Sequence, residues 1–184
     1  PVPSVAPLAR SSSRRLPPLV TFQPGWNFFA LPVLPENGVV VVLLPSFAQD
    51  FEQIAKFEPA TGKFSHHVGT PKFDAFSALE YGVGYQVYCK AAGPVTVRFT
   101  GTLPTKKLSK SLSVGWHLVG FTGLTSTSAA SWLVGVDATD VRDASLSPIT
   151  QVEPGKAYWV KVRTASIFSP SLPRDPTTWF LYDG

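Results

Sequence analysis

The chain has 184 residues, enough for one domain or for two small modules of about 80 residues each. Only 15% of the residues are charged and 44% are hydrophobic, a composition that favours a surface partly covered in an assembly. No apolar run approaches the roughly 20 residues that a membrane-spanning helix needs, and the single cysteine, Cys89, excludes a disulfide framework within the chain.

Residues 1–20 form the first segment with a distinct composition. They contain five prolines and three arginines and no acidic residue, and such a segment cannot build a core of its own. We expect an extended arm that docks on a neighbouring subunit, since proline lowers the entropy lost on docking; the alternative is an arm folded back on its own body. The expected contact residues are Val2, Val5, Leu8, Arg10, Arg14, Arg15 and Leu16.

The next segment, residues 21–102, is predicted to be a β module. The whole chain has 18 prolines and 14 glycines, which favours short strands and turns over long helices. Asn37-Gly38 is a strong hairpin signal, and the apolar run 39–44 that follows it is typical of a buried strand. A short helix capped by Ser46 is expected near residues 47–54. The remaining predicted strands are 22–33, 56–58, 63–66, 85–90 and 95–101.

A connector and a second module follow. Residues 103–113 are rich in lysine and serine, as in a solvated connector or an edge strand. Residues 114–184 are predicted to form the second β module. Its expected elements are a strand at 115–121, a short capped helix at 125–131, a stretch 133–139 aligned with 54–60, and strands at 158–163 and 177–182.

The two modules contain the same motifs in the same order. Gly25-Trp26 is matched by Gly115-Trp116, and Tyr85 in a Gly-x-x-Tyr strand is matched by Tyr158. This pattern predicts an internal repeat, with Trp26, Tyr85, Trp116 and Tyr158 packed inside their modules. The interval from tryptophan to tyrosine is longer in the first copy, and we place the extra residues at the Asn37-Gly38 hairpin and in a loop near residues 69–75.

The motifs resemble those of a module found in tandem in secreted and cell-surface proteins of bacteria. The opening Gly25-Trp26-Asn27 with Leu31-Pro32 and the closing Glu153-Pro154-Gly155 with Tyr158-Trp159-Val160 carry the resemblance, which covers residues 22–163. His117 and Gln86 depart from it, standing where asparagine and tryptophan are usual. The resemblance implies an architecture and an extracellular or particle setting, and no catalytic residue.

Three sets of polar residues were considered as sites of chemistry. His66 and His67 are adjacent on an expected strand and point to opposite faces, so they suit a polar surface strand better than a metal site. His117 has no nucleophile-elbow motif near it. The acids Asp137, Asp140 and Asp143 lack the glycine and the distal glutamate of a calcium loop. We therefore predict no catalytic residue, no metal site, no cofactor and no enzyme.

The partner classes follow from charge and aromatic content. Beyond residue 20 the chain is nearly neutral and shows no basic face with interleaved aromatics, so we expect no nucleic acid on the body. Five tryptophans leave a glycan-binding platform open. The sequence predicts an all-β protein of two homologous sandwich- or barrel-like modules, a structural subunit of an extracellular, cell-surface or virion assembly such as a coat, appendage or filament. The alternative is a secreted adhesion or carbohydrate-binding module.

Overall fold

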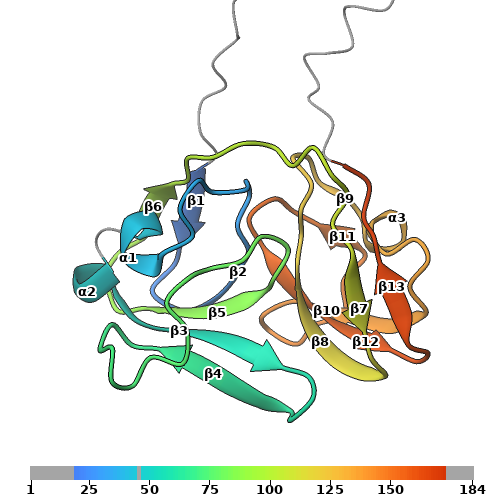
Figure 1. Cartoon of the computed structure of the whole chain (residues 1–184), viewed down its shortest axis with the longest axis horizontal. Helices are drawn as coiled ribbons and strands as arrows, with labels where there is room; N and C mark the ends of the chain where they lie inside the picture. The colour runs from blue at the N-terminus through green and yellow to red at the C-terminus, as the bar shows by residue number, and fades with distance from the viewer. Residues whose placement is uncertain (1–18, 45–46, 173–184) are drawn as a thin grey trace, which may run out of the picture.

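The computed structural model describes residues 19–44 and 47–172, and these form antiparallel β-sheets with three one-turn helices (Figure 1). The prediction of an all-β fold is confirmed. The N-terminal half, residues 19–102, and the C-terminal half, residues 110–172, lie side by side, with the stretch between them crossing the top of the view in Figure 1. No helix in the described ranges is long and apolar enough to cross a membrane.

The N-terminal half is built on a four-stranded sheet in the order β2-β5-β3-β4, with β1 and β6 paired separately. Its elements are β1 (Leu19–Phe22), β2 (Gly25–Phe29), α1 (Val40–Leu43), α2 (Phe47–Asp50), β3 (Phe51–Glu58), β4 (Lys63–His67), β5 (Tyr85–Cys89) and β6 (Val95–Arg98).

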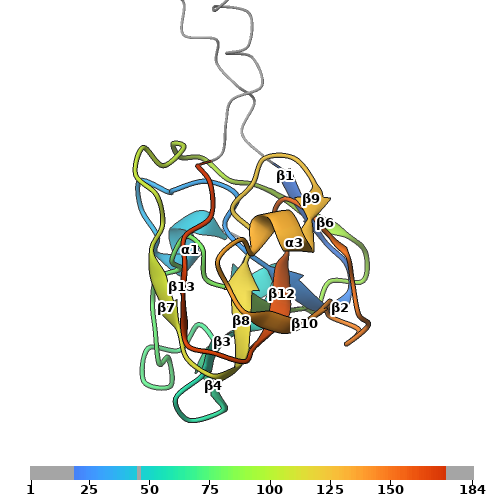
Figure 2. The same ribbon diagram turned by 90° about the vertical axis from the view of Figure 1, so that its right-hand side faces the viewer.

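The C-terminal half is built on a three-stranded sheet in the order β10-β12-β8, which faces the viewer in Figure 2. Two further strand pairs, β7 with β13 and β9 with β11, complete it. Its elements are β7 (Lys110–Leu112), β8 (Gly115–Gly120), β9 (Thr127–Ser128), α3 (Ala129–Trp132), β10 (Ala138–Arg142), β11 (Gln151–Val152), β12 (Ala157–Val162) and β13 (Ser166–Phe168).

The apolar run 39–44 was wrongly predicted to be a strand, because most of it is helix α1. Four valines and two leucines favour a strand by propensity. Val40, Leu43 and Leu44 are buried whereas Val42 is 54% exposed, which is the spacing of one helical turn and not of a strand. The backbone N–H of Leu44 donates to the Val40 carbonyl at 2.8 Å and closes the turn.

The two central sheets have the same strand register. In the β2–β5 pair Phe29 lies opposite Tyr85, and in the β8–β12 pair Val119 lies opposite Tyr158. The strand on the other side of each tyrosine strand has a register shift at the same position. In β3 the shift lies between Phe51 and Gln53, and in β10 it lies between Ala138 and Asp140.

The turns before the tyrosine strands contain the same hydrogen bond. The Tyr85 hydroxyl accepts from the backbone N–H of Glu80 at 2.7 Å, and the Tyr158 hydroxyl accepts from the backbone N–H of Glu153 at 2.8 Å. Both tyrosines are buried, Tyr85 completely. Burial is the main cause that raises the pKa of both phenols, that of Tyr158 to about 12.

These registers correct the expected alignment of residues 133–139 with 54–60. The shift in each ladder places Ala138 in the position of Phe51, so that 133–137 precede the strand. The extra residues of the N-terminal half lie mainly in the β3–β4 extension and the loop after it, since β10 pairs only with β12 in the described chain. The sequence of β4, Lys63–His67, contains no signal that this strand is an addition.

The two tryptophans of the shared motifs, Trp26 and Trp116, do not occupy the cores. Trp26 is 51% exposed and Trp116 is partly exposed, so the prediction that both pack inside their halves is wrong. Side chains alternate along a strand, and the core face of β2 is taken by Phe29, which puts Trp26 on the outer face. The same alternation places Trp116 opposite to buried Val119 in β8.

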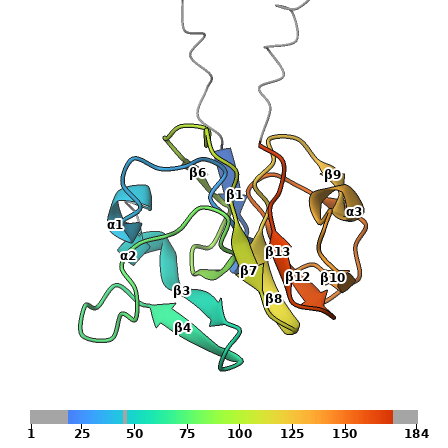
Figure 3. The same ribbon diagram turned by 45° about the vertical axis from the view of Figure 1, so that its right-hand side comes forward.

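A third apolar cluster joins the halves. It consists of Ala30, Leu118 and Ala157, with Phe28, Phe57, Phe64 and Trp159 packed against it. Three backbone bonds cross this seam among the described residues. The Ala30 N–H donates to the Gly155 carbonyl at 3.0 Å, the Gly120 N–H to the Gly82 carbonyl at 3.2 Å, and the Gly84 N–H to the Leu118 carbonyl at 3.3 Å. Figure 3 shows β8 of one half beside β3 of the other.

The boundaries differ from those expected. Leu19 and Val20 belong to β1, which pairs with β6, so they are part of the first half and not of an arm. Lys110–Leu112 form β7, which pairs with β13, so the connector is shorter than 103–113. Lysine and serine did not reveal this strand because only Leu112 of β7 is fully buried. The expected strand at 177–182 lies outside the described residues.

Candidate functional site

An aromatic cluster surrounds Trp159 on the outer face of β12. The Trp159 ring lies edge-on to the rings of Phe57, Phe28, Phe64 and Trp116, with centroid distances of 4.9, 6.0, 6.1 and 6.3 Å. Such edge-to-face pairs contribute about 0.5–1.5 kcal/mol each beyond their buried area. The cluster therefore fixes the position of Trp159 and Trp116 between the two halves.

A hollow of about 370 Å³ opens beside this cluster, lined by Phe57, Trp116, Arg142, Leu146 and Trp159. Phe57 comes from β3 of the N-terminal half and the other four residues from the C-terminal half. Its volume is within the range of roughly 300–1,000 Å³ that is typical of small-molecule sites. The walls are almost entirely apolar, so a ligand would meet ring faces and one aliphatic side chain.

Leu146 is held in the hollow by an unusual backbone conformation. Its φ is +60°, which costs a leucine about 1–2 kcal/mol. The turn that imposes it is fixed by Asp143, whose Oδ1 accepts from the backbone N–H groups of Ser145 at 2.8 Å and Ser147 at 3.1 Å. The Leu146 side chain is nonetheless 58% exposed, so its own burial does not explain the strain.

Two cations flank the ring of Trp116. The Arg142 guanidinium carbon and the Lys161 ammonium each lie 5.7 Å from the Trp116 ring centroid, within the distance of a cation–π contact. The Arg142 Nε also donates to Asp140 Oδ2 at 2.7 Å, which partly neutralises this guanidinium. Lys161 forms no ion pair with any carboxylate of the described chain.

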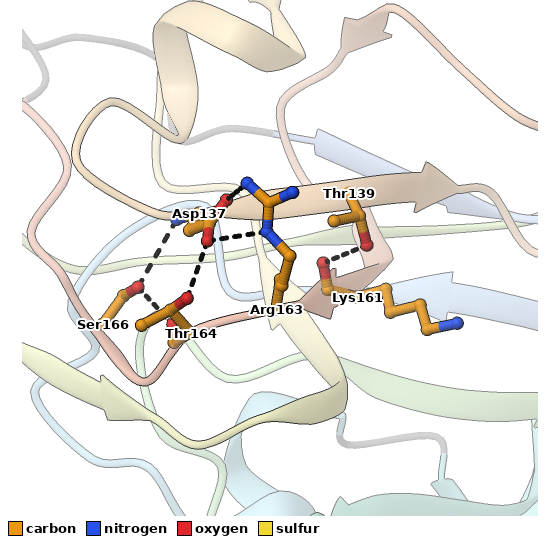
Figure 4. Close-up of polar contacts among 6 residues, drawn as sticks. All are labelled: Asp137, Thr139, Lys161, Arg163, Thr164 and Ser166. Atoms are coloured by element: carbon orange, nitrogen blue, oxygen red, sulfur yellow. Dashed lines mark hydrogen bonds and ion pairs between the residues drawn. The ribbon is translucent and has the colours of Figure 1, made fainter.

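A separate polar cluster lies to one side of Lys161 (Figure 4). Asp137 accepts from Arg163 Nη2 at 2.9 Å and Nε at 3.1 Å, and from the Thr164 hydroxyl at 2.8 Å. These hydrogen bonds lower the pKa of Asp137 and raise that of Arg163. The cluster fixes the bend between β12 and β13. In Figure 4 the Lys161 side chain extends away from Asp137, so this carboxylate does not neutralise its charge.

The histidines have structural roles in the described contacts. His66 is exposed, with Nδ1 3.1 Å from Gln53 Oε1. His67 is buried, with Nδ1 2.9 Å from the Phe76 carbonyl and 3.3 Å from Asp74 Oδ2. The two point to opposite faces of β4, but the prediction of a surface position is wrong for His67 because the inner face of β4 packs against Phe47.

His117 occupies the place that Asn27 has in the other half. Its Nε2 donates to the Ser113 carbonyl at 2.8 Å, as the Asn27 Nδ2 donates to the Gln23 carbonyl at 2.8 Å. Each bond stabilises the turn that precedes its strand, β8 for His117 and β2 for Asn27. Burial lowers the pKa of His117, the bond to Ser113 opposes this, and nearby Lys110 lowers it further.

The three aspartates considered for calcium are engaged separately, Asp137 with Arg163, Asp140 with Arg142 and Asp143 within its own turn. The described ranges contain no group of three or more metal-ligating side chains. Cys89 is buried in the first core. The expected arm contacts, Val2, Val5, Leu8, Arg10, Arg14, Arg15 and Leu16, all lie outside the described residues.

Sequence reasoning missed the hollow because its residues come from four separate places in the chain. Trp116 and Trp159 were noted as aromatic residues, but Phe57, Arg142 and Leu146 carried no signal. One signal was available: Trp159 and Lys161 are two residues apart on a strand and therefore share a face.

Searches of protein-family models, of curated proteins and of solved structures find no match for this chain.

Proposed function

We propose that this chain is a non-enzymatic structural subunit of an extracellular or virion assembly, built from two copies of one β module. The common strand registers, the equivalent tyrosine hydrogen bonds and the equivalent turn bonds of Asn27 and His117 support the two copies. Most of the corresponding residues described above stabilise cores and turns. Titratable residues also correspond, and their shared contacts are backbone bonds: the Lys90 N–H donates to the Asp50 carbonyl as the Arg163 N–H donates to the Asp137 carbonyl, both at 2.9 Å.

The observation that carries the proposal is the seam between the halves. By strand register, Ala30 corresponds to Gly120 and Gly82 corresponds to Gly155. The Ala30 N–H donates to the Gly155 carbonyl, and the Gly120 N–H donates to the Gly82 carbonyl, so each half makes the same bond to the other. This is the arrangement of a two-fold interface, in which one surface patch meets a copy of itself. The seam shows that the module buries apolar surface against a copy of itself. Because the seam occupies both copies of that patch, we propose that contacts between chains use the apolar side chains that it leaves exposed.

The remaining surface supports this interpretation. Large apolar side chains on both halves are more than half exposed, and only 15% of the chain is charged. Scattered apolar residues are ordinary on a monomer, but few charges are available to separate them here. The exposed residues are Leu19, Trp26, Val42, Phe73, Val114, Val134, Leu146 and Ile167.

The test is the mass of the native protein in solution, measured by light scattering over a range of concentrations. We expect a mass that is a multiple of the 19.9 kDa chain. A variant that lacks residues 1–18 should shift toward the monomer, because those residues are proposed to bind a neighbour. A monodisperse monomer at every concentration would rule out the assembly role, and an unchanged oligomer after the deletion would rule out the tether alone.

A second candidate function is a secreted adhesion or carbohydrate-binding module. The hollow beside Trp116 and Trp159 favours it, because exposed aromatic faces in a concave site can stack on sugar rings. Assembly and glycan binding are compatible in one protein, so the two functions need separate tests.

A further inference from the structure

We propose that the hollow lined by Phe57, Trp116, Arg142, Leu146 and Trp159 binds an anionic polysaccharide. This inference rests on the second candidate function and assigns its site and the charge of its ligand. The apolar C–H face of a sugar ring would lie against the aromatic walls, and the acidic substituent of that ring would lie at Arg142 and Lys161.

The first step of the argument is the chemistry of the walls. Three aromatic side chains and one leucine line the hollow, so a ligand without an apolar face would gain little from entering it. Lys161 and Arg142 are the charged groups placed against the rim ring, each 5.7 Å from the Trp116 centroid. A ligand with an apolar face and a negative substituent matches both features.

The second step is the balance of charge. Asp140 partly neutralises Arg142 through its 2.7 Å contact, but Lys161 has no carboxylate partner in the described chain and points away from Asp137. Asp140 also lies opposite Lys161 in the β10–β12 register without forming an ion pair with it. An anion at the rim would therefore meet two cations that share one carboxylate. A neutral sugar would leave both cations facing solvent and would gain only the stacking contact.

The third step is an internal comparison. In β2–β5 the partner of Trp26 is Tyr88, whereas in β8–β12 the partner of Trp116 is Lys161. On the neighbouring strand, Ala55 occupies the register position that Arg142 has in the other half. Among the described residues no cation contacts the ring of Trp26, so the same scaffold holds its tryptophan without counterparts of Arg142 and Lys161.

The last step is the strain at Leu146. A glycine would adopt φ of +60° without cost, yet the position holds a leucine that is more than half exposed. Backbone strain of this kind concentrates at binding sites. The energy that the strain costs is balanced if the leucine serves as a wall for a ligand.

The experiment is affinity electrophoresis of the full chain in gels that contain polygalacturonate, with neutral dextran and dextran sulfate in parallel gels. We expect retardation by polygalacturonate and none by dextran; dextran sulfate shows whether sulfate replaces carboxylate. Trp116→Ala and Lys161→Gln should each weaken retardation at least tenfold. The matched control Trp26→Ala changes the equivalent tryptophan and should leave retardation unchanged.

Leu146→Gly keeps the test independent of folding. This change relieves the left-handed strain, so the protein should unfold at no lower temperature while its affinity for polygalacturonate falls severalfold. Retardation by polygalacturonate that survives in Trp116→Ala and Lys161→Gln would overturn the site, as would a loss that equally follows Trp26→Ala.

The remaining outcomes separate the inference from the function on which it rests. Retardation by dextran that is lost in Trp116→Ala keeps a glycan-binding module but overturns an anionic ligand. No retardation in any gel rejects both. If Lys161→Gln reduces the native mass and leaves polygalacturonate binding intact, the hollow is a contact between subunits and the inference is wrong.

Discussion

The two halves share a backbone pattern but fill their cores differently. Phe29 and Val119 occupy the same position opposite a buried tyrosine, so the N-terminal half has the larger residue there. The last residue of the helical turn is Leu43 in α1 and Trp132 in α3, so the C-terminal half has the larger residue at this second place. We therefore propose that the helix of the C-terminal half supplies the bulk that its strand lacks, since cores are closely packed.

The outer faces of the same sheets differ in a way that packing does not compensate. The N-terminal half shows Trp26 beside Tyr88, with a ring distance of 5.2 Å, and the C-terminal half shows Trp116 between Arg142 and Lys161. Cores must be filled in both halves, whereas outer faces are free to differ. The comparison therefore teaches that a difference on the outer face is the better indicator of function.

The largest expected effects test the exchange of core volume. Trp132→Ala and Phe29→Ala should each reduce the free energy of unfolding by about 3–5 kcal/mol, since each side chain packs against several rings. The matched changes Leu43→Ala and Val119→Ala remove less volume and should cost less within each pair. Urea denaturation measures all four, and a reversed order in either pair would contradict the proposed exchange.

The order of the motifs is the basis of the proposed repeat, but the packing of its residues could not be predicted from that order. The motifs around Trp26 and Tyr85 marked corresponding strands because turn glycines and a buried tyrosine are required by the backbone itself. The face of β2 on which Trp26 lies could not be predicted, because it depends on which residues of the strand are buried. Phe29 is buried, so Trp26 lies on the opposite, outer face. The hollow depended on contacts between residues far apart in sequence, which no local pattern contains.

The next effect concerns the seam. A Cβ added to Gly120 would lie 2.7 Å from the Ala30 Cβ and 2.7 Å from the Val83 carbonyl oxygen. Gly120→Ala should therefore destabilise the protein by about 1–3 kcal/mol. Adding Ala30→Gly exchanges the two corresponding residues and should restore part of this loss, because one of the two clashes disappears. Equal stability of the single and double variants in urea would show that Ala30 and Gly120 do not meet across a two-fold seam.

A smaller effect compares the two tyrosine hydrogen bonds. Tyr85→Phe and Tyr158→Phe each remove the acceptor of a backbone N–H at almost the same distance. Each should cost about 1 kcal/mol, the usual net contribution of one hydrogen bond. Thermal unfolding of the two variants should give losses that agree within about 0.5 kcal/mol. A loss of stability in only one variant would mean that the two hydrogen bonds contribute differently to stability despite their equal geometry.

The smallest effect depends on pH and distinguishes His117 from its counterpart Asn27. The pKa of His117 is lowered by burial from its ordinary value of 6.5, so the unfolded chain binds a proton more readily than the folded protein does. As the pH falls through 6.5, the unfolded state is therefore favoured, and stability declines until the folded protein is protonated too.

His117→Asn removes this dependence, because asparagine does not titrate and already makes the equivalent bond in the other half, from Asn27 to the Gln23 carbonyl. Urea midpoints of the two proteins should run parallel above about pH 7 and diverge below it, with the histidine protein losing more stability. Control curves for Asn27→Ala should keep the pH dependence, since that variant retains His117. Parallel curves down to acidic pH would mean that the bond to Ser113 fully offsets the effect of burial on the pKa of His117.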